Sequence, residues 1–274
     1  MMMQATLREP LRFKGIGLHT GAHAAVEVRP ANAGDGISFL IGKSRVPASV
    51  DYVLDTSRAT LIGIDGATVS TTEHLLSALF ALGVSNAEIV VDGPEIPALD
   101  GSAAEFAAAI ATGGLAMQSR PRRVLELERP YWVRAGERMI AAFPSDAFRV
   151  RFIADFPPPI GTQYYDGAID SQRFRTEIAG ARTFAFLHEI EALWARGLGR
   201  GGSLENALVF APDGPMQPLR WPNEAVRHKV LDLVGDFALL GAWPQCEIVA
   251  IKSGHELHAA MLRVLQAPMS VPSA

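Results

Sequence analysis

Imidazole and carboxylate groups, which bind metals and move protons, recur at one-turn spacing in a single stretch of the chain. His228, Asp232 and Asp236 are each four residues from the next. Apolar residues recur around them at helical spacing, which predicts a helix that Asn223 can cap and Gly241 can end. Residues four apart lie on one face of a helix, so the imidazole of His228 and the carboxylate of Asp232 can share one metal ion.

An ordinary surface ion pair would explain the same spacing of His228 and Asp232. The neighbouring residues favour a metal instead, because the helix is mostly apolar and a buried carboxylate without a partner is unfavourable. The apolar residues of this stretch are Val226, Val230, Leu231, Leu233, Val234 and Phe237.

A second chemically capable pair, Glu73 and His74, stands at the start of another predicted helix. Ser70 and Glu73 have the spacing of a capping box and Gly83 can end the helix. Glu73 is therefore either a cap or a catalytic carboxylate, and His74 either a core residue or a metal ligand. The partial positive charge of a first helical turn disfavours imidazolium, which keeps His74 in the neutral state that a ligand needs.

The elements around these two helices follow from periodicity and from turn residues. The opening of the chain, residues 5–64, is predicted to be rich in strands. Composition places a linker at 113–123, so we expect one domain over 1–117 and another over 124–274. Further helices are predicted at 103–111, 174–179, 190–196 and from 252 to about 265, and further strands at 86–93, 124–127, 131–133, 139–143, 148–153 and 246–251.

Two glycine-rich segments invite a ligand-binding interpretation. The run from Gly15 to Gly21 does not predict a dinucleotide site, because its third glycine is one residue late and a strand is expected to follow. The glycines between Gly197 and Gly202 predict a loop that suits a ligand, or that forms only a turn.

Composition limits the class of protein. The 274 residues are 49% hydrophobic and 20% charged, which is typical of a soluble enzyme. The net charge is −4 and no basic run occurs, so nucleic acid is not expected as a partner. Cys246 is the only cysteine, which excludes a disulfide framework and a cysteine zinc cluster. No signal peptide or integral membrane segment is predicted, and we expect a cytoplasmic location.

Six segments in chain order together resemble the LpxC family, the UDP-3-O-acyl-N-acetylglucosamine deacetylases of lipid A biosynthesis. The resemblance runs from Gly15 to about Leu265, and a collinear match of six motifs is far more specific than any one of them. The segments are Ser70-Thr71-Thr72-Glu73-His74, the run from Pro94 to Ala103, Ala181-Arg182-Thr183-Phe184, the run from Gly201 to Asn206, the run from Arg227 to Asp236, and Lys252-Ser253-Gly254-His255.

The resemblance implies a fold and a set of roles. The fold is α+β, a two-layer sandwich of two similar domains that each pack helices on a β-sheet, with the active site at their junction. The implied cofactor is Zn²⁺, and we expect a monomer. The implied metal ligands are His74, His228 and Asp232, the implied catalytic residues are Glu73, His255, Lys229, Asp236 and Thr183, and the implied substrate-binding residues are Phe184, Lys229, Gly202 and Ser203.

These residue types suit hydrolysis of an amide. Three protein ligands leave zinc one position for water, Glu73 can accept the proton of that water, and His255 can deliver a proton to the departing amine. A binding protein with structural zinc is the less favoured class, because structural zinc sites usually have four protein ligands.

The implied substrate is a small acylated nucleotide sugar, whose acyl chain needs an apolar passage. The same side chains could simply pack a helix against the core. Residues 40–58 and 185–205 and the run Pro157-Pro158-Pro159 depart in detail from the family, so a relative that deacetylates another N-acyl sugar is the alternative function. The candidate passage residues are Phe184, Phe186, Leu187, Ile190, Leu193, Trp194 and Leu198.

Overall fold

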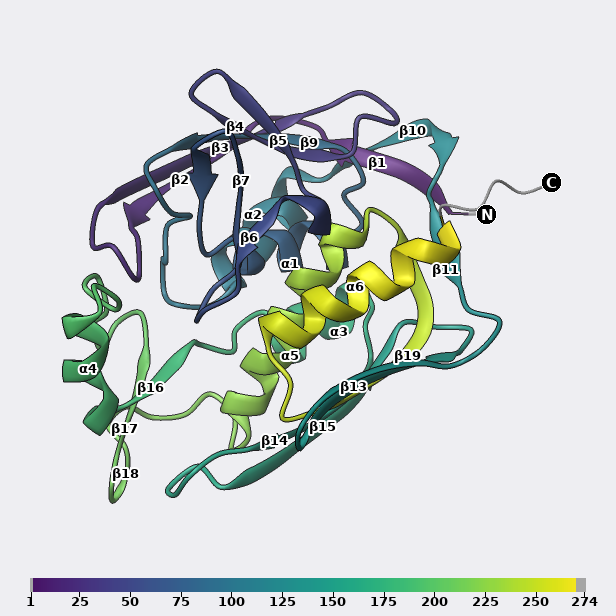
Figure 1. Ribbon diagram of the computed structural model, residues 1–274. Helices are drawn as coiled ribbons and strands as arrows, with labels where there is room; N and C mark the ends of the chain where they lie inside the picture. The colour runs from purple at the N-terminus through teal and green to yellow at the C-terminus, as the bar shows by residue number, and fades with distance from the viewer. Residues whose placement is uncertain (1, 270–274) are drawn as a thin grey trace.

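The protein is an α+β structure in which four helices lie between two main sheets (Figure 1). The computed structural model describes residues 2–269. The central helices are α1 (Glu73–Ala81), α2 (Ala104–Gly113), α5 (Glu224–Phe237) and α6 (His255–Met269). Each of the two main sheets therefore turns one face towards a shared helical interior.

The first main sheet has the strand order β2-β3-β9-β4-β5. Neighbouring strands are antiparallel except β4 and β9, which run parallel. Its strands confirm the predicted strand-rich opening, and β3 directly follows the first glycine run, as expected for a segment that is not a dinucleotide site. The strands are β2 (Leu11–Ile16), β3 (His23–Pro30), β4 (Ile37–Ile41), β5 (Ser44–Pro47) and β9 (Ala87–Asp92).

The second main sheet has the order β12-β13-β19-β14-β15, and β11 pairs with the start of β19. Along β19 buried and half-buried residues alternate, and Cys246, Ile248 and Ala250 are buried, as a strand with one covered face requires. Helix α5 packs on β14 and β15, and α6 packs on β12 and β13. The strands are β11 (Val124–Glu126), β12 (Tyr131–Ala135), β13 (Arg138–Pro144), β14 (Arg149–Asp155), β15 (Thr162–Ala168) and β19 (Trp243–Ile251).

Three smaller sheets complete the fold. The sheet of β16 (Phe184–Phe186), β17 (Leu208–Ala211) and β18 (Gly214–Pro215) lies with helix α4 (Ile190–Ala195) at one end of the molecule (Figure 1). The sheet of β6 (Val53–Asp55), β7 (Leu61–Ile64) and β8 (Ala67–Val69) leads into α1.

The third small sheet includes most of the segment that composition assigned to a linker. Strand β10 (Leu115–Pro121) pairs antiparallel with β1 (Met3–Leu7), with Leu115 opposite Leu7. Residues 113–123 therefore include a paired strand, which their glycines and charges did not predict. A single cluster of buried apolar residues also draws on both halves of the chain, since it includes Phe39 and Phe152.

The helix ends correct two capping predictions. Helix α1 begins at Glu73, and Thr72, with no side-chain cap, holds the N-cap position, so Ser70 and Glu73 form no capping box. Thr71 has a φ of 57°, which turns the chain before the helix starts. Asn223 precedes α5 without capping it, because its side chain bonds to the Tyr164 carbonyl and the Arg227 guanidinium instead.

Other element ends agree with the sequence more closely. A 3-10 turn at Ala238–Leu240 follows α5 and ends at Gly241, whose φ of 67° is the left-handed conformation that glycine adopts freely. The segment predicted as a helix at 174–179 is a short helix, α3 (Ser171–Arg173), continued by a π-helical turn, η2 (Phe174–Ile178). Within residues 2–269, no helix is long and apolar enough to cross a membrane.

Candidate active site

Close packing of α1 against α5 creates the site. Gly235 of α5 faces the backbone of Glu73, and a Cβ atom on Gly235 would collide with the Glu73 carbonyl oxygen. The two helices can therefore approach until their backbones nearly touch. This approach brings His74, at the start of α1, against His228 and Asp232 on α5.

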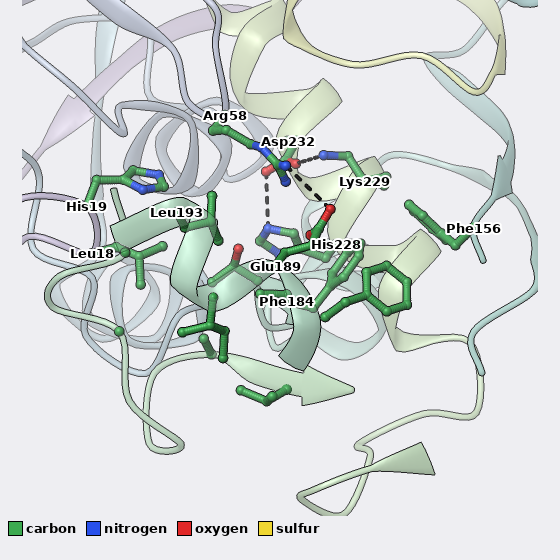
Figure 2. A pocket seen from close by; sticks show the side chains of 18 of the residues that line it. Leu18, His19, Arg58, Phe156, Phe184, Glu189, Leu193, His228, Lys229 and Asp232 are labelled. Atoms are coloured by element: carbon green, nitrogen blue, oxygen red, sulfur yellow. Dashed lines mark hydrogen bonds and ion pairs between the residues drawn. The ribbon is translucent and has the colours of Figure 1, made fainter. Parts of the chain in front are cut away.

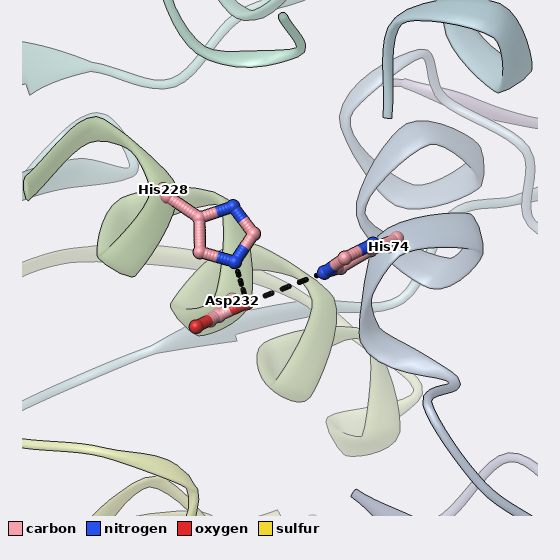
Figure 3. Close-up of side chains that lie close together, drawn as sticks. All are labelled: His74, His228 and Asp232. Carbon is pink, nitrogen blue, oxygen red and sulfur yellow. Dashed lines mark ion pairs between the residues drawn. The ribbon is translucent and has the colours of Figure 1, made fainter. Parts of the chain in front are cut away.

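The three predicted metal ligands converge on one point (Figure 3). The Nε2 atom of His228 lies 3.4 Å from Oδ1 of Asp232, and the Nε2 atom of His74 lies 3.8 Å from the same oxygen. Ligand atoms about 2.0–2.1 Å from a tetrahedral ion lie about 3.4 Å from each other. The donor atoms therefore have the type and spacing that Zn²⁺ needs.

The protonation states of these side chains also suit a metal ligand. Burial lowers the pKa of His74 to about 3, and the neighbouring His228 adds to the effect. Burial also lowers the pKa of His228, against the attraction of Asp232. Burial alone would raise the pKa of Asp232, but the neighbouring His228, Lys229 and His255 hold it well below its usual range. Two neutral imidazoles and one carboxylate therefore face each other, as metal binding requires.

Glu73 and His255 lie beside the three ligands. Oε1 of Glu73 is 3.9 Å from Nε2 of His255, and Oε2 accepts a hydrogen bond from the Thr60 backbone N–H. Burial raises the pKa of Glu73 to about 8, although His255 opposes the shift. Burial alone would lower the pKa of His255, but Asp236 raises it to about 9. A buried carboxyl group and a buried imidazole thus lie together beside the three predicted ligands.

Asp236 lies within hydrogen-bonding distance of two histidines, His255 and His258. Its Oδ2 atom is 2.7 Å from Nδ1 of both His255 and His258, and Thr60 Oγ1 donates a hydrogen bond of 2.6 Å to Oδ1. Burial would raise the pKa of Asp236, but His255 and these hydrogen bonds keep it well below the usual range. The ionised carboxylate therefore accepts a hydrogen bond from the Nδ1–H of His255, and Nε2 of the same ring faces Glu73.

A cavity of about 600 Å³ opens from the metal ligands towards β16 and α4 (Figure 2). Most of the predicted substrate-binding and passage residues line it. Leu187 and Leu198 do not, which corrects two of the passage assignments; Leu187 lies on the outside and is 44% exposed. Besides Glu73, His255 and the three predicted ligands, the predicted residues on the cavity wall are Thr183, Phe184, Phe186, Ile190, Leu193, Trp194, Gly202, Ser203 and Lys229.

Comparison with known proteins identifies the family. The sequence profile described as LpxC, UDP-3-O-acyl N-acetylglycosamine deacetylase, matches residues 4–267. The chain belongs to the LpxC family.

The chain is similar to relatives that carry the name UDP-3-O-acyl-N-acetylglucosamine deacetylase, among them the following three. That of Syntrophotalea carbinolica is 44% identical over 274 residues, which cover 97% of this chain and 89% of the relative. That of Phenylobacterium zucineum is 45% identical over 275 residues, covering 97% and 94%. That of a Nostoc species is 44% identical over 268 residues, covering 94% and 96%.

In this LpxC-family chain, Lys229 contacts a predicted metal ligand. Its Nζ atom lies 2.5 Å from Oδ2 of Asp232, while Oδ1 of Asp232 faces the two histidines. Lys229 also lies on the cavity wall, where its ammonium group can meet a substrate. The aromatic ring of Phe184 packs edge-on against the ring of His228, with centroids 6.2 Å apart.

Several residues of the LpxC-family site escaped prediction from the sequence. His258 is buried behind Asp236, and the only signal for it was its position three residues after His255 in a helix. Thr60 comes from the loop before β7, far away in the sequence, and has no sequence signal. Arg58, in the same loop, pairs with Glu189 at 3.6 Å across the cavity (Figure 2).

Proposed function

We propose that the protein hydrolyses the N-acetyl amide of a UDP-3-O-acyl-N-acetylglucosamine, releasing acetate and a free amine in lipid A biosynthesis. The observation that carries the proposal is the convergence of His74, His228 and Asp232 at one end of an apolar cavity, beside Glu73 and His255. Membership of the LpxC family supports the same reaction.

We infer that His74, His228 and Asp232 hold the Zn²⁺. When bound, Zn²⁺ polarises the amide carbonyl and makes a water molecule more acidic. Glu73 accepts the proton of the attacking water, since its carboxylate lies next to the ligands and its raised pKa makes it a stronger base than an ordinary carboxylate. The hydrogen bond from the Thr60 N–H holds Oε2 of Glu73 in place, and Oε1 remains to accept the proton.

We infer that His255 delivers the proton that the departing nitrogen needs. An amine leaves far more readily when protonated, and Asp236 keeps the imidazolium form of His255 favoured. The Nδ1 atom of His255 is engaged with Asp236, so the proton available to the substrate is on Nε2.

We propose that Lys229 and Thr183 stabilise the negative charge that develops on the amide oxygen. We further propose that the substrate contacts Phe184, Gly202 and Ser203. All of them lie on the cavity wall. We propose that the apolar side chains of Phe186, Ile190, Leu193 and Trp194, which also line the cavity, receive the acyl chain.

The substrate is tested by the release of acetate. Burial of an acyl chain contributes about 0.8 kcal/mol per methylene, so removal of the 3-O-acyl group should lower catalytic efficiency by several orders of magnitude. Equal efficiency with UDP-N-acetylglucosamine and its 3-O-acyl derivative would favour a deacetylase of another sugar and leave the metal chemistry intact.

The metal is tested by its content in purified variants. We expect about one zinc per chain in the wild type and a large loss in His228→Ala and Asp232→Ala. His23→Ala is the matched control, because His23 is an exposed histidine that pairs with Asp92, away from the predicted ligands. Wild-type zinc content in both site variants would refute the ligand assignment.

We also propose that residues 1–117 and 124–274 are two domains of a two-layer sandwich with the site at their junction, acting as a cytoplasmic monomer. Each main sheet draws its strands from one half of the chain, and the ligands come from both halves. One chain supplies every residue of the site, and the single buried thiol of Cys246 suits a reducing compartment.

A further inference from the structure

A single peptide group joins a buried carboxylate to a metal ligand. The Nδ1 atom of His228 donates a hydrogen bond of 3.0 Å to the carbonyl oxygen of Ala181. The N–H of the same peptide group, that of Arg182, donates a hydrogen bond of 3.1 Å to Oε1 of Glu224. Glu224 and His228 are four residues apart on α5, so one face of the helix holds both ends of this chain of hydrogen bonds.

Glu224 is a fully buried carboxylate that accepts hydrogen bonds from Arg182 and from Arg220. It is 0% exposed and accepts four hydrogen bonds. Besides the Arg182 N–H, the donors are the Arg182 guanidinium, through Nε at 2.9 Å and Nη2 at 3.2 Å, and the Arg220 N–H at 2.6 Å. A buried charge held this fully has one fixed position.

A fixed negative charge at one end of a peptide group strengthens the other end as an acceptor. Hydrogen bonds in a chain polarise one another, so the pull of Glu224 on the Arg182 N–H makes the Ala181 oxygen a better acceptor for His228. Metal-binding histidines commonly donate their second ring N–H to a carboxylate or a carbonyl, which fixes the ring and makes its free nitrogen a better ligand. In this chain the histidine donates to the Ala181 carbonyl, and the Glu224 carboxylate accepts the N–H of the same peptide group.

We propose that Glu224 is a positioning residue that acts through the 181–182 peptide group on His228, fixing its ring and strengthening Nε2 as a metal ligand. The proposal rests on the metal site proposed above. It assigns Glu224 a role that its ion pair with Arg182 alone does not require.

The test compares metal affinity in three variants with the wild type. Glu224→Gln removes the charge at nearly constant shape. Arg182→Gln removes the guanidinium but keeps the backbone N–H that links Glu224 to the peptide group. Glu177→Gln is the matched control, because Glu177 also pairs with arginines beside this segment but its carboxylate does not bond to the 181–182 peptide.

Zinc dissociation constants are measured by competition with a chelator, and the visible spectrum is recorded with Co²⁺ in place of zinc. We expect Glu224→Gln to raise the dissociation constant about 10- to 100-fold and to shift the Co²⁺ spectrum. Arg182→Gln should stay within about threefold of the wild type, and Glu177→Gln should not differ from it.

Three results would overturn the inference. Wild-type affinity and spectrum in Glu224→Gln, even with a lower melting temperature, would leave Glu224 a purely structural role. Equal losses in Glu224→Gln and Arg182→Gln would assign the effect to the ion pair. If Glu224→Gln does not fold, Arg182→Gln decides alone: a tenfold loss of its zinc affinity rejects the inference. Failure of the wild type itself to bind zinc would instead refute the proposed metal site.

Discussion

Glu73 occupies the first position of α1, where a carboxylate often serves only the helix. In this chain its carboxylate accepts a hydrogen bond from the Thr60 N–H, and His255 lies beside it. Burial keeps its pKa high, so it can both take and hold a proton during a reaction.

We expect Glu73→Ala to retain zinc and to lose activity by about 10²- to 10⁴-fold, because that is the usual contribution of a general base. Zinc content and kcat are measured on the same preparation. A residue that only capped the helix would instead lower stability by about 1 kcal/mol and leave the rate near that of the wild type.

Asp236 should determine how the reaction rate varies with pH, because it acts on the pKa of His255. His255 must be protonated to act as an acid, so the rate should fall as pH rises through its pKa of about 9, while protonation of Glu73 should limit the rate on the acidic side. Among the groups that raise the pKa of His255 against burial, Asp236 contributes most, followed by Glu73 and Asp232.

In Asp236→Asn we therefore expect the basic limb of the kcat/KM profile to move to lower pH. The profile is recorded for the wild type and the variant over the same buffers. A basic limb at the wild-type position would show that another group supplies it.

At the scale of elements, the site depends on how closely α1 and α5 approach. Alanine is normally preferred to glycine inside a helix by about 1 kcal/mol, so replacement of a helical glycine should stabilise the chain unless space is lacking. At Gly235 the space is lacking, because the Glu73 carbonyl oxygen occupies it.

We expect Gly235→Ala to lower the free energy of unfolding by about 1–3 kcal/mol or more and to weaken zinc binding, because the helices must separate. The matched control is Gly113→Ala in α2, where the new Cβ would meet only the Leu11 side chain at 3.4 Å. Denaturant unfolding and zinc affinity are measured for both variants. A Gly235→Ala variant as stable as the control would contradict the proposed close contact.

The sequence predicted the helices that carry the site better than it predicted their ends. Periodicity identified α1, α5 and their chemically capable side chains, because one face of each helix repeats at a fixed spacing. The start of α1 was misplaced, since the backbone turn at Thr71 is set by contacts of the folded chain, including the bond of its hydroxyl to the buried Glu95. Thr60 joins the site only through tertiary folding, which no local pattern records.

At the scale of the molecule, the metal ligands bridge the two halves of the chain. His74 follows strands β2 to β5 of the first main sheet in the sequence, whereas His228 and Asp232 precede β19 of the second. The apolar core is also continuous between the halves, and the guanidinium of Arg122 stacks at 4.4 Å from the ring centre of Trp243 while bonding to the Phe80 carbonyl. Polar contacts and a continuous apolar core therefore both join the two halves of the chain.

Removal of the metal should consequently destabilise the whole molecule in one step. A ligand that binds only the folded chain at 100 times its dissociation constant adds about 2.7 kcal/mol, so a chelator should lower the melting temperature by several degrees. Because the ligands and the core span both halves, we expect one calorimetric transition before and after chelation. His74→Gln is the control, since it should melt lower and respond little to the chelator. Two transitions, of which the chelator shifts only one, would mean that the halves unfold independently and that the metal is held by one of them.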